Sequence, residues 1–95
     1  MSNAAMADTV LRLLADIAPE LDPDEIRPDV NLRDQLDLDS MDFLNFMIAI
    51  HQEFGIEIPE ADYRKLYTLE GCVEYLRATL HARASDVPDG QNSPG

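Results

Sequence analysis

One stretch constrains the fold of this chain more than any other: an acidic turn at residues 37–42 that opens an apolar helix. Asp39 is a suitable N-cap, because its carboxylate can accept hydrogen bonds from the free N–H groups of a first helical turn. Asp42 stands three residues later, where an acidic side chain can reach back to the cap. The pattern predicts a helix over residues 40–54 with Ser40 at its entrance, close to the positive end of the helix dipole.

This predicted helix carries apolar side chains on two of its sides. One stripe at i, i+4, i+7 and i+11 is expected to face the core, with Phe46 beside it: Phe43, Met47, Ile50 and Phe54. The second stripe, at i, i+3 and i+7, consists of Met41, Leu44 and Ile48. A surface helix of a small domain needs only one stripe, so the second indicates either burial on most sides or a surface for partners.

Apolar periodicity elsewhere predicts three further helices. A first helix runs from a cap at Asp8 or Thr9 to about Ala18, a short helix covers about residues 60–66, and a last helix follows a cap at Thr68. The expected fold is all-α: a small four-helix bundle of three main helices and one short helix, with a long loop between the first and second helices.

The long loop, about residues 19–39, has apolar side chains that can anchor it across the core: Leu21, Ile26, Val30, Leu32 and Leu36. Asn31 followed by Asp34 predicts one capped turn within it. We take residues 7–83 as the folded domain.

The two ends of the chain are interpreted differently from this domain. We interpret residues 1–6 as a tag remnant or disordered N-terminus. Residues 84–95, rich in Ser, Asp, Pro and Gly, are expected to be a disordered tail.

The charge of the chain limits its partners. Nineteen acidic residues against seven basic ones give a formal charge of −12, which argues against nucleic acid and favours partners with basic surfaces. The single cysteine, Cys72, allows no internal disulfide, and a reducing compartment, the cytoplasm, is the simplest interpretation. No run approaches the ~18 apolar residues of a membrane span. We also expect the protein to be a monomer.

The sequence Asp39-Ser40-Met41 resembles the phosphopantetheine attachment motif of acyl carrier proteins, in which Asp-Ser-Leu opens the second helix. The resemblance extends from about Asp8 to Leu80 and includes the segment after that helix, residues 54–59. In the family, the serine is esterified to 4′-phosphopantetheine, whose thiol carries acyl groups as thioesters. The resemblance therefore implies a covalent 4′-phosphopantetheine on Ser40, no metal site, no catalysis by the chain itself, and a role in fatty-acid, lipid or secondary-metabolite synthesis.

The resemblance also implies partners and the residues that meet them. The partners are a phosphopantetheinyl transferase, which supplies coenzyme A and its metal, and acyl-loading and acyl-transferring enzymes with basic docking surfaces. Partner recognition would involve Asp37, Asp39, Met41, Asp42, Leu44 and Ile48. An acyl chain carried between the helices would be lined by Phe43, Phe46, Met47, Ile50, Ile58 and Leu66, for which ordinary core packing is the alternative.

Some residues depart from the family pattern. The positions of Asn45, His51 and Gln52 are commonly acidic in fatty-acid-synthesis carriers, and the position of Asp37 is often glycine. Much of the acidity lies instead in the long loop. These departures favour a specialised stand-alone carrier over a housekeeping one. The alternatives are a peptidyl or polyketide carrier domain, or an unmodified acidic helical interaction module, which would have no need of the Ser40 hydroxyl.

Other chemistry fits the chain less well. A serine hydrolase would need a G-x-S-x-G elbow, which is absent, and His51 and His81 are expected to be surface side chains. An EF-hand placed on Asp37 lacks the turn glycine and the final glutamate. Cys72 lies on an apolar helix face and is expected to be a small buried hydrophobe.

Overall fold

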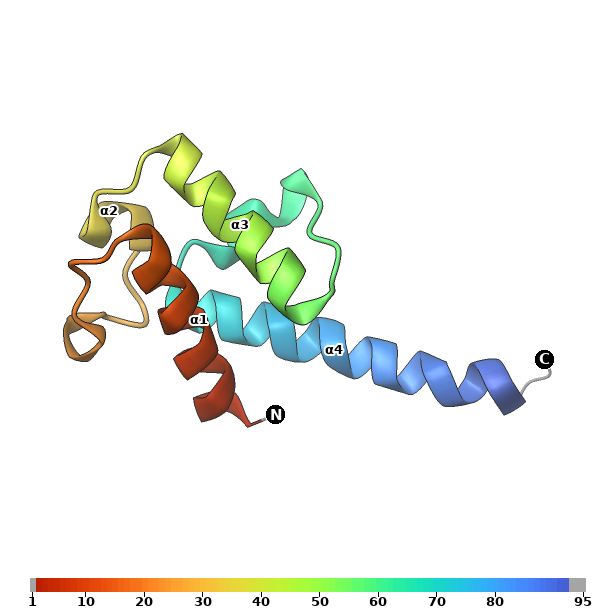
Figure 1. Ribbon diagram of the computed structural model, residues 1–95. Helices are drawn as coiled ribbons and strands as arrows, with labels where there is room; N and C mark the ends of the chain where they lie inside the picture. The colour runs from red at the N-terminus through yellow and green to blue at the C-terminus, as the bar shows by residue number, and fades with distance from the viewer. Residues whose placement is uncertain (1, 93–95) are drawn as a thin grey trace.

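The computed structural model of the protein describes residues 2–92, and the side chains of residues 2–82. Within these residues the chain contains helices and no strand, so the predicted all-α fold is confirmed. The elements, of which η1 and η2 are 3₁₀ helices, are α1 (Asn3–Ile17), η1 (Pro23–Glu25), α2 (Leu32–Leu36), α3 (Ser40–Phe54), η2 (Glu60–Leu66) and α4 (Leu69–Asn92). Figure 1 shows α1, α3 and α4 as the long helices, with α2 in the connection between α1 and α3.

The bundle is held together by a single apolar core. Helix α1 packs against both α3 and α4, and η2 packs against α4. The side chains that are almost completely buried include Val10, Leu14, Leu32, Phe46, Met47, Ile50, Leu66, Cys72 and Leu76. No polar or charged side chain among residues 2–82 is buried, so apolar burial rather than internal polar pairing stabilises the fold.

Helix α3 has the predicted bounds, and α1 begins earlier than predicted. Gly55 ends α3 in the left-handed region at φ 65°, which glycine adopts without steric cost. Helix α1 starts at Asn3, where Ser2 Oγ accepts a hydrogen bond of 3.1 Å from the Ala5 N–H, and Met6 is only 4% exposed. Residues 3–6 are therefore helical, which differs from the disorder that was one of the two expectations for residues 1–6. Met6 lies one turn before Val10 on the same buried face, so its burial favours this extension.

Helix α4 begins where predicted and extends further. The Thr68 hydroxyl caps it by accepting a hydrogen bond of 2.9 Å from the Gly71 N–H. Its helical backbone continues to Asn92, which differs from the disorder expected from residue 84; residues 93–95 lie outside the described part. Adding a residue to an existing helix gains a hydrogen bond without a new nucleus, so the packed turns of α4 favour its continuation. Figure 1 shows these last turns projecting beyond the bundle.

The long connection is anchored as the sequence predicts. Leu32 is buried, Leu21, Ile26 and Leu36 pack against the core, and Val30 is half-buried. The Leu32 N–H donates to the Tyr67 carbonyl at 2.6 Å, and the Glu70 N–H donates to the Pro28 carbonyl at 3.0 Å. The connection therefore pairs with the segment that joins η2 to α4.

A polar clamp in this connection was not foreseen. Gln35 Nε2 donates to the carbonyls of Arg27 and Val30 at 2.9 Å each, and Gln35 Oε1 accepts from the Arg27 N–H at 3.0 Å. One side chain thus pairs backbone groups that have no partner in a regular helix or sheet. Gln35 fixes α2 to the loop before it.

Candidate functional site at the start of α3

Ser40 is exposed at the first residue of α3. The predicted capping box is present: Asp39 Oδ1 accepts from the Asp42 N–H at 2.8 Å, and Asp42 Oδ2 accepts from the Asp39 N–H at 3.5 Å. The box fixes the direction in which the chain enters the helix. The first turn of any helix also leaves N–H groups without helical acceptors, so the Ser40 hydroxyl lies at a position that favours an anion.

A left-handed residue turns the chain from α2 into this site. Asp37 has φ 56° and ψ 44°, a conformation that glycine adopts freely and that Asp tolerates better than most residues. The next residue, Leu38, is buried, and its N–H donates to the Arg33 carbonyl at 3.0 Å. The end of α2 is thereby held beside the start of α3.

The turn brings one basic side chain to Ser40. Arg33 Nη2 lies 3.3 Å from Ser40 Oγ, to which it donates a hydrogen bond, and Arg33 Cζ lies 5.9 Å from the ring centroid of Phe43. The sequence around Ser40 indicates acidic neighbours, and the contact of Arg33 with the serine is not predicted from it. The available signal was that Arg33 is the one Lys or Arg between Arg27 and Arg64.

The second apolar stripe of α3 is exposed rather than buried. Met41, Leu44 and Ile48 are 64%, 38% and 45% exposed, and they are the large hydrophobic side chains exposed within residues 2–82. Leu44 and Ile48 lie about 6 and 12 Å along the helix axis from Ser40, at the usual rise per residue. Asp37 and Asp39 are exposed and Asp42 is half-buried, so acidic and apolar groups adjoin Ser40 on one surface.

The six residues considered for an acyl chain do not all line one space. Phe43, Phe46, Met47, Ile50 and Leu66 are buried, and Ile58 is half-buried. A hollow of about 210 Å³ has Met47 and Ile58 in its lining, together with Ile48, His51, Glu57 and Tyr63. The structure therefore brings two of the six to an accessible hollow.

Aromatic rings fill the core near this site. The ring centroid of Phe43 lies 6.1 Å from that of Phe46, 6.2 Å from that of Tyr63 and 5.3 Å from that of Tyr67, all in edge-to-face arrangements. Such pairs are favourable beyond their buried area. They join α3 to η2 and to the residue that follows it.

The remaining candidates behave as structural groups. Cys72 is buried, which raises the pKa of its thiol, and its S–H donates to the Leu66 carbonyl at 3.3 Å. His51 and His81 are exposed, and His51 Nδ1 contacts the Ile56 carbonyl. The described residues hold no cluster of three or more His, Cys, Asp or Glu arranged for a metal ion, and among them no helix is long and apolar enough to cross a membrane.

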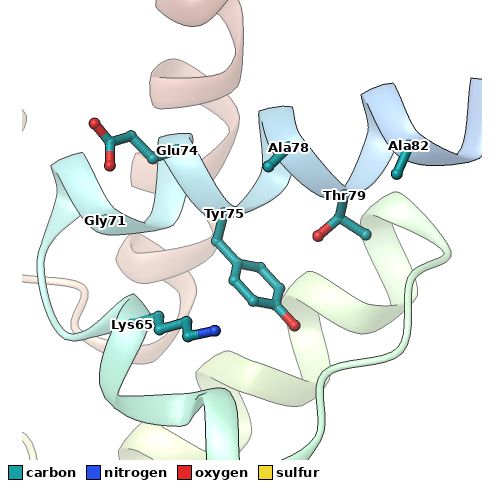
Figure 2. Close-up of a pocket in the computed structure, with 7 residues that line it drawn as sticks. All are labelled: Lys65, Gly71, Glu74, Tyr75, Ala78, Thr79 and Ala82. Atoms are coloured by element: carbon teal, nitrogen blue, oxygen red, sulfur yellow. The ribbon is translucent and has the colours of Figure 1, made fainter.

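A larger hollow, about 630 Å³, lies between η2 and α4 and includes no residue of α3. Lys65 of η2 and Tyr75 of α4 extend into this region, and Glu74 belongs to its lining as well (Figure 2). The Tyr75 hydroxyl donates to Asp62 Oδ2 at 2.8 Å, and Lys65 Nζ lies 3.4 Å from Asp62 Oδ1. The Tyr75–Asp62 hydrogen bond joins α4 to η2, and the Lys65–Asp62 ion pair lies within η2.

Known proteins resemble the chain across this whole domain. Residues 8–76 match the family model described as a phosphopantetheine attachment site. An acyl carrier protein from Lactobacillus johnsonii is 35% identical over 74 residues, which are 75% of this chain and 92% of that protein. The chain belongs to the acyl carrier protein family. A second acyl carrier protein, from Lactobacillus acidophilus, is 33% identical over 78 residues, which are 82% of this chain and 96% of that protein.

The fold agrees with a solved structure of an acyl carrier protein from Enterococcus faecalis. The TM-score is 0.71 at 24% identity, and the match covers 83% of this chain and 99% of that one. The protein is an acyl carrier, and its covalent prosthetic group is 4′-phosphopantetheine. The start of α3 fits such a group, because it offers an exposed hydroxyl at the positive end of a helix and one guanidinium.

Proposed function

We propose that this acyl carrier bears 4′-phosphopantetheine on Ser40 Oγ, as a phosphodiester. One observation carries the proposal: Ser40 is the only one of the four serines that lies within the matched residues 8–76. Its exposed position at the capped start of α3 supports the same assignment.

The chain exposes the Ser40 hydroxyl to a transferase and does not itself catalyse the attachment. His51 lies eleven residues along α3 from Ser40, about 16 Å at the usual helical rise, so it does not act as a base for that hydroxyl. A phosphopantetheinyl transferase would take the hydroxyl proton, and Ser40 Oγ would attack the pyrophosphate phosphorus of coenzyme A that bears the pantetheine. The pyrophosphate P–O bond would break, and 3′,5′-ADP would leave. The bound group then supplies the thiol that holds an acyl chain as a thioester.

Partner enzymes dock on the surface around Ser40. The exposed stripe of Met41, Leu44 and Ile48 offers apolar contact next to the hydroxyl. Asp37, Asp39 and Asp42 add negative charge that steers partners with basic surfaces. Replacement of Ile48 by Asn would keep α3 helical and weaken this apolar contact.

Several residues set this carrier apart from a fatty-acid carrier with an acidic second helix. Asn45, His51 and Gln52 are exposed on α3 and carry no negative side chain. We infer a specialised carrier that works as a monomer in the cytoplasm, with the hollow lined by Met47 and Ile58 as the point where an acyl chain meets the bundle.

The test is the intact mass before and after incubation with coenzyme A, magnesium and a broad-specificity phosphopantetheinyl transferase. The wild type is expected to gain one phosphopantetheine. Ser40→Ala should gain none. Ser2→Ala is the matched control, because Ser2 also stands at a helix N-terminus and is exposed, and it should gain one.

Absence of a mass gain in folded wild-type protein would contradict the assignment and favour an unmodified interaction module. A gain in Ser40→Ala would place the group elsewhere. Efficient replacement of a housekeeping carrier in elongation assays with standard fatty-acid enzymes would refute the specialised role.

A further inference from the structure

The guanidinium of Arg33 lies next to the Ser40 hydroxyl, where it would contact a group attached to that oxygen. Its Nη2 is 3.3 Å from Ser40 Oγ, and its guanidinium carbon is 5.9 Å from the centre of the Phe43 ring. An arginine has five N–H donors, so one bond to a neutral hydroxyl leaves most of its donors available. The Phe43 contact limits the positions that the guanidinium can adopt.

The backbone that carries Arg33 is fixed on both sides. Asn31 Oδ1 accepts from the Arg33 N–H at 2.8 Å, and the Leu38 N–H donates to the Arg33 carbonyl at 3.0 Å. Gln35, two residues later, is held by its hydrogen bonds to Arg27 and Val30. The position of Arg33 next to Ser40 is therefore built into the fold of α2.

The local charge makes Arg33 exceptional. Four carboxylates lie within six residues of Ser40 in the chain: Asp34, Asp37, Asp39 and Asp42. Each of them would repel an anion attached to Ser40, and Arg33 is the one Lys or Arg between Arg27 and Arg64. Within residues 2–82 the ion pairs are Arg12 with Glu53 and Lys65 with Asp62, and Arg33 belongs to neither.

We propose that Arg33 is a positioning residue that binds the phosphate attached to Ser40; the inference rests on the proposed attachment at that serine. A phosphodiester carries one negative charge, and its non-bridging oxygens accept the N–H donors that arginine presents. The contact offsets repulsion by the neighbouring carboxylates and restricts the first bonds of the prosthetic arm to the side of α3 that faces α2.

The experiment compares apo and holo forms of four proteins: the wild type, Arg33→Gln, Arg33→Lys and Arg27→Gln. Arg27 is the matched control, because it lies in the same loop and contacts Gln35 through its backbone alone in the hydrogen bonds described. Intact mass first establishes that each protein gains one phosphopantetheine. Urea unfolding of apo and holo forms then gives the change in folding equilibrium constant caused by modification.

The holo-to-apo ratio of folding equilibrium constants should be roughly two- to fivefold larger in the wild type and in Arg27→Gln than in Arg33→Gln. This size is expected for an exposed charged contact. Arg33→Lys should retain part of the effect, and 0.5 M salt should reduce it. The ³¹P NMR signal of the holo protein should shift in Arg33→Gln and not in Arg27→Gln.

A purely structural role of Arg33 would lower apo and holo stability equally, and its substitution would leave the holo-minus-apo difference unchanged. That result, with an unshifted ³¹P signal, would overturn the proposal. Failure of the wild type to gain mass would instead refute the attachment at Ser40, and the role of Arg33 would fall with it.

Discussion

Gly71 provides a strict test of how η2 packs against α4. A Cβ atom at this position would lie 2.2 Å from the Lys65 carbonyl oxygen and 3.0 Å from Thr68 Oγ1. Real Cβ atoms essentially never lie closer than 3.0 Å to such an atom, so the carbonyl would have to retreat by about 0.8 Å. Lys65 O belongs to the backbone and precedes the fully buried Leu66, so this movement would disturb the core.

The two effects of Gly71→Ala oppose each other and differ in size. Alanine in place of glycine within a helix gains about 1 kcal/mol from propensity alone. Overpacking that forces a backbone shift costs typically 1–3 kcal/mol. We place the cost near 3 kcal/mol, because a backbone carbonyl cannot swing aside as a flexible side chain can. The expected result is a net loss of about 2 kcal/mol in the free energy of unfolding.

Urea unfolding followed by far-ultraviolet circular dichroism measures this loss. Ala78→Gly is the control, because Ala78 is exposed on the same helix and its replacement should cost about 1 kcal/mol from propensity alone. Gly71→Ala should lower stability although it introduces the better helix former. A Gly71→Ala protein as stable as the wild type would show that η2 does not approach α4 so closely, and would refute the reasoning.

Three further predictions concern single side chains. Asp37→Gly should stabilise the protein by about 1 kcal/mol in urea unfolding, because Asp37 has φ 56°, and Asp37→Val should destabilise it; the reverse order would contradict the left-handed turn. Burial and the hydrogen bond to Asp62 raise the pKa of Tyr75 from 10.0 to about 12. Stability should therefore fall as pH rises from about 10 to 12, and Tyr75→Phe should lose less over that interval in thermal melts; equal losses would refute the pKa shift. Gln35→Ala should cost about 2 kcal/mol in urea unfolding through its three hydrogen bonds, whereas Gln52→Ala, at an exposed site on α3, should cost almost nothing; equal effects would contradict the clamp.

The start of α3 was predictable because its determinants are local. Asp39 and Asp42 are three residues apart, and a capping box requires only that spacing. The exposed stripe of Met41, Leu44 and Ile48 follows from helical periodicity in the same way, since the other side of the helix already supplies enough apolar surface for the core. Its role in partner recognition stays a prediction.

Other features depend on contacts that spacing does not encode. Asp8 and Thr9 are suitable caps and predict a first helix that begins there, whereas Ser2 caps α1 and Met6 extends its buried face. In the sequence, Gln35 has no feature that distinguishes it from other polar residues. Its hydrogen bonds to the backbone of Arg27 form only because the folded loop brings the two residues together. Helical periodicity reports which faces are apolar, but not which polar side chain closes a loop.

Arg33 shows why net charge alone misrepresents this site. The chain carries a formal charge of −12, and the residues around Ser40 read as uniformly acidic. The left-handed conformation of Asp37 nevertheless turns the chain so that α2 presents its arginine to the serine hydroxyl. The carboxylates of Asp37 and Asp39 and the cation that faces Ser40 therefore lie close together at the start of α3. The basic surface of a partner enzyme would be repelled locally by the Arg33 guanidinium. A phosphate on Ser40 would pair with that guanidinium and reduce the repulsion. Modification would thus make the surface more uniformly negative, and docking partners with basic surfaces should bind the holo form in preference to the apo form.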